Sequence, residues 1–162
     1  MNGIIKQKVI LVDVDGTLSD NEHRQHWLDK EKHSGLTEDE RWDVFFASCF
    51  LDKLKLSTAA VVNAMFKEGF RPVIFTGRPE RYKEMTREWL NYHQVPFVAI
   101  YTRKDDDRRP DHEVKEGMLT QLYLDLGVTK HDIALVLDDR DSVVAMWRRI
   151  GLTCFQVAPG DF

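Results

Sequence analysis

Short runs of aliphatic residues recur along the chain and alternate with stretches of helical periodicity. The apolar runs predict strands at Val9–Val12, Pro72–Thr76, Phe97–Tyr101, Ile133–Leu137 and Thr153–Val157. Capping and stop residues predict four helices. The first is capped by Ser57 and runs to Lys67, and the second runs from Pro79 to His93. The third is capped by Asp111 and runs to Asp125, and the fourth runs from Arg140 to Ile150. Alternating strands and helices are typical of βαβ units. We therefore expect an α/β fold around a central parallel sheet of about five strands.

One segment, Ser19–Leu56, interrupts the alternation because it contains no convincing strand. Its pattern predicts two short helices, near Glu22–Lys32 and Glu38–Phe50, separated by Gly35-Leu36-Thr37. We expect a small helical insertion, over about 19–56, that covers one edge of the sheet. Apart from this insertion, residues 1–162 are expected to form a single domain.

Composition narrows the class of protein. The chain has 162 residues, of which 43% are hydrophobic and 31% charged, as in soluble globular proteins. No apolar run approaches the roughly 20 residues that span a bilayer, and Met1–Lys8 shows no secretory pattern, so we expect a cytoplasmic protein. Cys49 and Cys154 are expected to be reduced, buried thiols. The net charge of −4 argues against overall attraction to duplex nucleic acid but allows a local basic rim.

Two carboxylates at the end of the first predicted strand carry the most chemistry. Asp13 is the last residue of that strand, and Asp15 precedes Gly16 in the following turn. Ligands of open α/β sheets bind at the carboxyl ends of strands, so both carboxylates can reach one point beyond the sheet. One could attack a phosphorus atom as nucleophile while the other gives and takes protons.

Three further positions fall on the same predicted edge. Thr76 and Gly77 follow the second strand and offer a hydroxyl and an unobstructed backbone N–H to a phosphoryl oxygen. Lys115, early in the helix that begins at Asp111, offers a positive charge to a transition state. Asp138-Asp139 ends the fourth strand, and adjacent acids there suit Mg²⁺. Each feature alone is common in turns and surfaces, but together they predict one phosphoryl-transfer site.

This set of motifs resembles the haloacid dehalogenase (HAD) superfamily, in its phosphatase branch. The resemblance implies a Rossmann-like, three-layer HAD fold and a small cap. It also implies that Asp13 forms an aspartyl-phosphate and that Asp15 is the acid and base. Mg²⁺ would be held by Asp13, the carbonyl of Asp15 and Asp138, with Asp139 acting from the outer shell. An aspartate at position 15 points to phosphoryl chemistry rather than dehalogenation.

The C-terminal third is similar to the phosphatase domain of phage polynucleotide kinases, which removes 3′-phosphates from nucleic-acid ends. The similar segments are 137–140, 143–151 and 154–162. By this resemblance, five further residues would surround the substrate: Arg24, Arg78, Arg103, Arg109 and Asp111. The family's kinase phosphate loop, Gly-x-x-x-x-Gly-Lys-Ser/Thr, does not occur in the sequence, so we expect no kinase domain.

Substrate specificity should come from the arginines and the insertion. Arg103, Arg108 and Arg109 follow the third strand, and several guanidiniums around one pocket suit neighbouring backbone phosphates. Alternatively, Arg108 and Arg109 balance the acidic run 105–107.

Other side chains of the insertion allow two interpretations each. The aromatic ones stack on a base or pack the helices together, the latter favoured for Phe45 and Phe46; the four are Trp27, Trp42, Phe45 and Phe46. His23 and His26 are interpreted as a solvated helix face, since no third metal ligand accompanies them.

The sequence thus predicts a Mg²⁺-dependent phosphatase that acts on 3′-phosphorylated DNA or RNA ends. The alternative is a nucleotidase that hydrolyses free (deoxy)nucleoside monophosphates with the same residues. A non-catalytic module that only binds phosphorylated ends is disfavoured because every catalytic residue type is present. No membrane partner is expected, and oligomeric state is not predicted.

Overall fold

The computed structural model describes residues 8–160, so Asp161 and Phe162 of the C-terminal motif lie outside the described part. A parallel sheet forms the centre, in the order β5-β4-β1-β6-β7. Its strands are β1 (Val9–Val12), β4 (Arg71–Pro79), β5 (Ala99–Arg103), β6 (Ile133–Asp138) and β7 (Cys154–Gln156). The expectation of an α/β fold with five parallel strands is confirmed.

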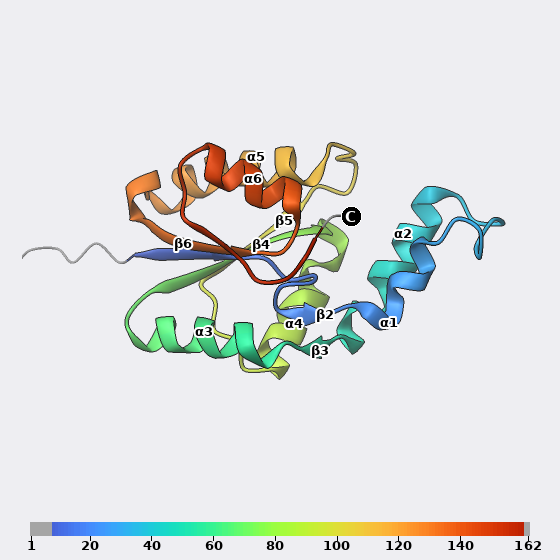
Figure 1. The fold of residues 1–162 in the computed structure, drawn as a ribbon, viewed down its shortest axis with the longest axis horizontal. Coiled ribbons are helices and arrows are strands. Elements are labelled where there is room, and N and C mark those ends of the chain that lie inside the picture. The colour runs from blue at the N-terminus through green and yellow to red at the C-terminus, as the bar shows by residue number, and fades with distance from the viewer. Residues whose placement is uncertain (1–7, 161–162) are drawn as a thin grey trace, which may run out of the picture.

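Helices cover both faces of the sheet (Figure 1). On one face lie α3 (Leu56–Lys67) and α4 (Lys83–Tyr92), and on the other α5 (Asp111–Leu126) and α6 (Asp141–Arg149). Side chains of β1 alternate between two apolar clusters: Ile10 and Val12 pack in one, Val9 and Leu11 in the other. Because β1 is central and buried on both faces, its residues are all aliphatic.

Strand register places the functional edge. Val12 pairs with Ile74 of β4 on one side and with Leu137 of β6 on the other. The residues that follow these three positions therefore emerge at one edge, as the sequence indicated.

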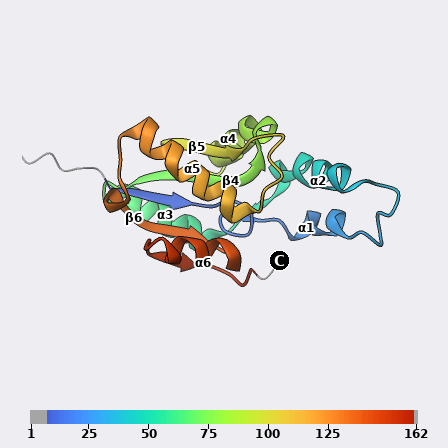
Figure 2. The same ribbon diagram turned by 90° about the horizontal axis from the view of Figure 1, so that it is seen from above.

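The insertion lies beyond the carboxyl edge of the sheet (Figures 1 and 2). It consists of β2 (Ser19–Asp20), α1 (Glu22–Gln25), the 3₁₀ turn η1 (His26–Leu28), α2 (Glu38–Ala47), the 3₁₀ turn η2 (Cys49–Leu51) and β3 (Lys53–Leu54). We call residues 21–52 the cap. Thr37 and Glu40 form a capping box that starts α2.

Several expectations about the insertion were wrong. β2 and β3 form an antiparallel pair where no strand was expected, because two residues are too few to show a periodicity. The helix expected over 22–32 ends at Gln25 and continues only as η1, while the helix expected over 38–50 ends at Ala47.

Other boundaries also shift. Helix α3 starts at Leu56, after Lys55, rather than after Ser57. Pro79 ends β4, and the 3₁₀ turn η3 (Glu80–Tyr82) precedes α4. Asp111 is the first residue of α5 and Pro110 its N-cap, so the Asp111 side chain is free for the site.

The cysteines and the helix lengths bear on two further expectations. Cys49 and Cys154 are free and buried. Within residues 8–160, none of the helices has the length and apolar character needed to cross a membrane.

Candidate active site

Asp13 lies directly after β1, at the carboxyl edge of the sheet. Its backbone N–H donates to the Leu137 carbonyl at 3.0 Å, which holds the ends of β1 and β6 together. The chain then turns at Gly16, whose φ is +83°. A Cβ at Gly16 would lie 2.0 Å from a carboxylate oxygen of Asp139. The turn therefore requires glycine, and it keeps Asp15 at the same edge as Asp13.

A buried lysine joins the carboxylates at this edge. The Lys115 Nζ, near the start of α5, donates to Asp13 Oδ1 at 2.8 Å and to Asp138 Oδ2 at 2.9 Å. Asp111 Oδ2 lies 3.5 Å from the same nitrogen. Burial alone would lower the pKa of Lys115, but the surrounding carboxylates outweigh it and raise the pKa. Lys115 is therefore a fixed ammonium between two strand ends.

Three carboxylates form a compact acidic cluster, Asp13, Asp138 and Asp139, in which one oxygen from each lies within 4.8 Å of the other two. Burial, reinforced by the other two carboxylates and opposed by Lys115, raises the pKa of Asp13. Burial and the charge of Asp138 raise the pKa of Asp139 to about 6. One ammonium does not balance three buried carboxylates, and oxygen donors suit hard cations. The cluster therefore fits a small divalent cation by charge and by donor type.

Two side chains orient the acidic cluster from outside it. Thr17 Oγ1 donates to Asp139 at 3.3 Å, and Trp147 Nε1 donates to Asp138 at 3.4 Å. Both donors are fully buried. Neither was singled out from the sequence for a role at the site.

Asp15 sits on a separate network of two arginines. Arg78 donates to both of its oxygens, through Nε at 2.9 Å and Nη2 at 2.8 Å, and Arg24 Nη2 donates to Oδ1. Both arginines also bind the buried carboxylate of Asp52: Arg24 Nε at 2.7 Å, Arg24 Nη2 at 2.6 Å and Arg78 Nη2 at 3.0 Å. Two guanidiniums are thus shared between two carboxylates. Asp52, which no sequence motif singled out, completes this charge balance.

This network sets the protonation state of Asp15. Burial works to raise the pKa of Asp15, but Arg78 and Arg24 outweigh it and hold the pKa well below its usual range. Both arginines are fully buried and do not line the cavity described below. The structure thus places them beneath Asp15 rather than on the rim where phosphate contacts were expected.

Thr76 and Gly77 lie near the end of β4. Thr76 is fully buried, and its Oγ1 accepts a hydrogen bond from the backbone of Arg78 at 3.3 Å. A Cβ at Gly77 would approach Asp111 Oδ1 to 2.5 Å. The start of α5 therefore packs against bare backbone, and Gly77 itself lines the cavity.

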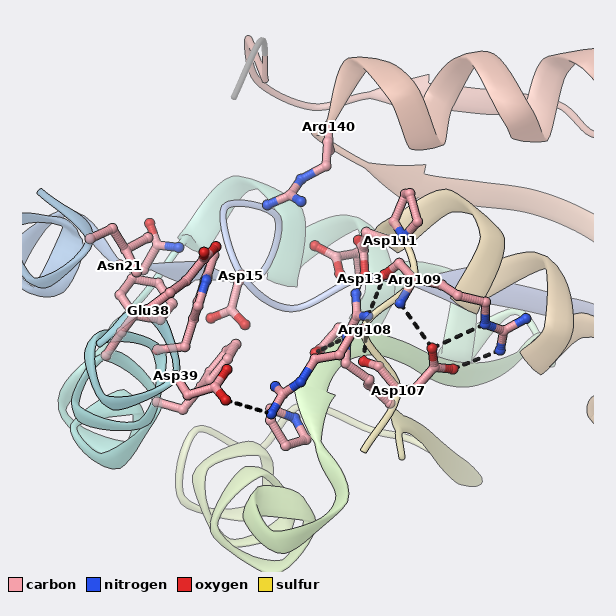
Figure 3. Close-up of a pocket in the computed structure, with 18 of the residues that line it drawn as sticks. Asp13, Asp15, Asn21, Glu38, Asp39, Asp107, Arg108, Arg109, Asp111 and Arg140 are labelled. Atoms are coloured by element: carbon pink, nitrogen blue, oxygen red, sulfur yellow. Dashed lines mark hydrogen bonds and ion pairs between the residues drawn. The ribbon is translucent and has the colours of Figure 1, made fainter. Parts of the chain in front are cut away.

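A cavity of about 560 Å³ opens above these groups, between the cap and the carboxyl edge of the sheet. Asp13 and Asp15 lie at its base (Figure 3). Five arginines line it: Arg81, Arg103, Arg108, Arg109 and Arg140. Six acidic side chains line the same cavity, so the cationic groups that a polyanion needs are gathered here among carboxylates.

The arginines that line the cavity, here called the rim arginines, differ in their hydrogen-bond partners. Arg103 donates to the carbonyls of Gly77, Asp107 and Arg109, and to Asp111 Oδ1 at 3.1 Å, so it fixes the loop after β5. Arg109 is exposed and paired with Asp107 at 2.6 Å (Figure 3). Arg103 is thus built into the site wall, whereas Arg109 can exchange its partner for a substrate.

Ion pairs also link the loop after β5 to the cap. Arg108 reaches Asp39 of α2 at 2.9 Å, and Arg81 reaches both Asp43 of α2 at 2.9 Å and Asp105 at 3.2 Å. The acidic run 105–107 thus accepts arginine hydrogen bonds. The alternative of local charge balance describes the Asp107–Arg109 pair, while Arg108 pairs across the cavity with the cap.

His23 and His26 share no interaction partner among the described residues. His23 Nε2 lies 2.9 Å from Asp52, and His26 packs its ring against Trp27. The candidate metal-ligand group within residues 8–160 contains neither histidine.

Comparison with known proteins identifies the family that this chain resembles over most of its length. The model of the phosphatase domain of polynucleotide kinase PNKP matches residues 7–162. The chain is 28% identical, with a TM-score of 0.76, to a chain in a structure of the Pnkp1/Rnl/Hen1 RNA repair complex. The match covers 98% of this chain and 45% of that one. A chain in another structure of the Pnkp1/Rnl/Hen1 complex is 29% identical, with a TM-score of 0.72 and coverages of 98% and 48%. The chain thus spans about half the length of these relatives.

A more distant structure supports the fold alone. A haloacid dehalogenase-like hydrolase from Streptococcus pneumoniae is 14% identical, with a TM-score of 0.60, over 92% of this chain and 83% of that one. The likeness at this identity shows the fold, which is the HAD arrangement.

Proposed function

The chain belongs to the family of polynucleotide kinase phosphatase domains and is a phosphatase of the HAD fold, and from this premise we propose that it removes 3′-phosphates from nucleic-acid ends. The observation that carries the proposal is the pairing of a buried Asp13–Lys115 centre with an arginine-lined cavity. The centre suits attack on phosphorus, and the cavity suits a polyanion.

In the first step we propose that an Asp13 oxygen attacks the phosphorus while the bond from phosphorus to the sugar oxygen breaks. Asp15 gives its proton to that leaving oxygen. Lys115, held between Asp13 and Asp138, stabilises the negative charge that grows on the phosphoryl oxygens. The phosphoryl group is then bound to Asp13 as a mixed anhydride.

In the second step Asp15 takes a proton from water, which attacks phosphorus and releases Asp13 and inorganic phosphate. The free protein already holds Asp15 as an anion, the form that this step requires. Asp15 needs a proton for the first step, and a substrate dianion beside it raises its pKa and favours proton uptake.

Mg²⁺ is the cofactor that this mechanism implies. The carboxylates of Asp13 and Asp138 would hold it, with the carbonyl of Asp15 as a further ligand and Asp139 acting from the outer shell by resemblance. When bound, Mg²⁺ supplies positive charge to the phosphoryl oxygens. The side chain of Asp15 stands apart from this cluster, on Arg24 and Arg78.

The nucleic-acid substrate is supported by the relatives and by the rim. Relatives at 28% and 29% identity come from structures of a Pnkp1/Rnl/Hen1 complex, one of them named an RNA repair complex. Arg108 and Arg109 are exposed, and they are more cationic groups than binding of the scissile phosphate alone requires. Phosphates of neighbouring nucleotides in DNA or RNA are their natural partners.

The test is phosphate release with Mg²⁺ from a 3′-phosphorylated oligonucleotide, compared with free 3′- and 5′-deoxynucleotides at equal low concentration. We expect kcat/KM for the oligonucleotide to be higher, and to fall steeply as salt is raised because several phosphate contacts are screened. Equal or better hydrolysis of the free nucleotides would instead establish a nucleotidase. Asp13→Asn serves as the inactive control.

A further inference from the structure

One wall of the cavity has no part in the phosphoryl chemistry. On the cap side, four apolar side chains line it beside the polar Asn21, Gln25, Glu38 and Asp39; the apolar four are Leu28, Trp42, Phe45 and Phe46. On the core side the lining is largely charged, with five arginines, with the two catalytic aspartates and with Asp107 and Asp111. A phosphate group gains no binding energy from contact with apolar side chains. This wall therefore indicates a ligand with both an anionic and an apolar part.

Trp42 is the ring of this wall that is best placed to meet a ligand. Phe46 stacks on it, with ring centroids 5.6 Å apart at 21°, and Phe45 meets its edge at 5.4 Å and 85°. Both phenylalanines are buried, whereas Trp42 is half-buried and lines the cavity. Phe45 is in turn covered by the guanidinium of Arg24 at 4.0 Å. The Trp42 ring is therefore held in place by packing against Phe45 and Phe46.

The other cap tryptophan provides a contrast. Trp27 stacks on His33 at 4.6 Å and is not among the residues that line the cavity. Both tryptophans belong to the cap and both are half-buried. Both also pack against the cluster of Phe45, Phe46 and Tyr82, and of the two only Trp42 lines the cavity as well.

We propose that Trp42 stacks on the base of the terminal nucleoside whose 3′-phosphate is removed, and so makes the enzyme specific for ends that carry a base. The inference rests on the proposed function and adds the part of the substrate that the cap recognises. A base has a π-face and no charge, so it suits the apolar wall while its phosphate lies at Asp13. Stacking of this kind tolerates any base sequence.

The experiment compares two 3′-phosphorylated oligonucleotides that differ only at the last position. One ends in an ordinary nucleoside 3′-phosphate, and the other in an abasic tetrahydrofuran 3′-phosphate. For Trp42→Ala we expect KM to rise about tenfold or more on the first and to stay unchanged on the second. Trp42→Phe should restore most of the loss. Trp27→Ala, the matched control, should leave both KM values unchanged.

Other outcomes separate the possibilities. An equal rise in KM on both ends would mean that Trp42 only holds the cap, and would overturn the inference. Unchanged KM on both ends would overturn it as well, while the proposed function would stand. If the wild-type protein hydrolysed neither 3′ end but hydrolysed free 5′-nucleotides, the proposed function would be wrong and the inference would fall with it. Thermal melting of each variant identifies any that fail to fold.

Discussion

At the scale of single residues, the site separates its two carboxylates electrostatically. Asp13 shares a lysine with other acids and has a raised pKa, while Asp15 rests on two arginines and has a lowered one. Different environments give chemically identical side chains different roles. The difference is produced by buried partners, so changes to those partners are the sharpest residue-level tests.

Asp52 is the first such partner. It is buried and accepts hydrogen bonds from both Arg24 and Arg78. In Asp52→Asn the two guanidiniums face only one carboxylate, so we expect the free energy of unfolding to fall by about 3 kcal/mol or more. The same change strengthens the positive field on Asp15 and should lower kcat. Denaturant unfolding and steady-state kinetics check both effects, with the exposed Asp106→Asn as control.

The acidic cluster predicts a pH dependence of stability. Burial and Asp138 raise the pKa of Asp139 to about 6 in the folded chain. The folded chain then binds more protons than the unfolded chain between the two pKa values, so stability falls as pH rises through about 6. Without metal, we expect the melting temperature to fall from about pH 4 to about pH 6, and Mg²⁺ to remove the fall. A melting temperature that is flat with EDTA, or that falls equally with Mg²⁺, contradicts this.

At the scale of elements, the start of α5 is positioned by the backbone at the end of β4. Gly77 leaves room for Asp111, the first residue of that helix. In Gly77→Ala the new methyl group would lie 2.5 Å from Asp111 Oδ1 and displace the helix that carries Lys115. We expect kcat to fall by at least about tenfold, because a small displacement of a charged group is costly in catalysis. Gly35→Ala, where no atom lies within 4 Å of the added Cβ, should have no effect.

Helix α2 of the cap is linked to the loop after β5 by exposed ion pairs. Asp39 holds Arg108 and stands where a substrate phosphate would compete for the same guanidinium. In Asp39→Asn we expect KM for the oligonucleotide to fall about two- to fivefold at low salt, since Arg108 no longer has to exchange a partner. KM for a small aryl phosphate should not change. Glu116→Gln, which removes the exposed partner of Arg149, is the matched control; an equal fall in that variant would show a mere effect of net charge.

At the scale of the whole molecule, the sheet and the helical insertion over it could be predicted, but the ends of the cap helices and the β2–β3 pair could not. The apolar run Val9–Val12 is buried on both faces and is followed by Asp13, so the run and the carboxylates after it located the central strand and the site edge. The strand pair β2–β3 escaped prediction because two residues carry no periodicity. Asp52 escaped for another reason, because its partners Arg24 and Arg78 lie 28 and 26 positions away. Folding brings such partners together, and local sequence does not encode their contact.

The burial of Arg24 and Arg78 shows the same limit. From the sequence they were grouped with Arg103 and Arg109 as substrate ligands. The structure separates them, because the cap folds back over Asp15 and encloses the first two, while the loop after β5 leaves Arg109 exposed. Residue type indicated an affinity for phosphate, and only the fold decides which arginines can meet one.

The measurement that tests the account most directly is mass spectrometry of the protein, acid-quenched during turnover of a 3′-phosphorylated oligonucleotide with Mg²⁺. The account predicts one phosphoryl group on the peptide that contains Asp13, formed before steady state and lost on further incubation. Asp13→Asn should show neither the phosphoryl group nor phosphate release, while retaining the wild-type fold. Phosphate release by Asp13→Asn at the wild-type rate would contradict the covalent mechanism and remove Asp13 from the centre of the site.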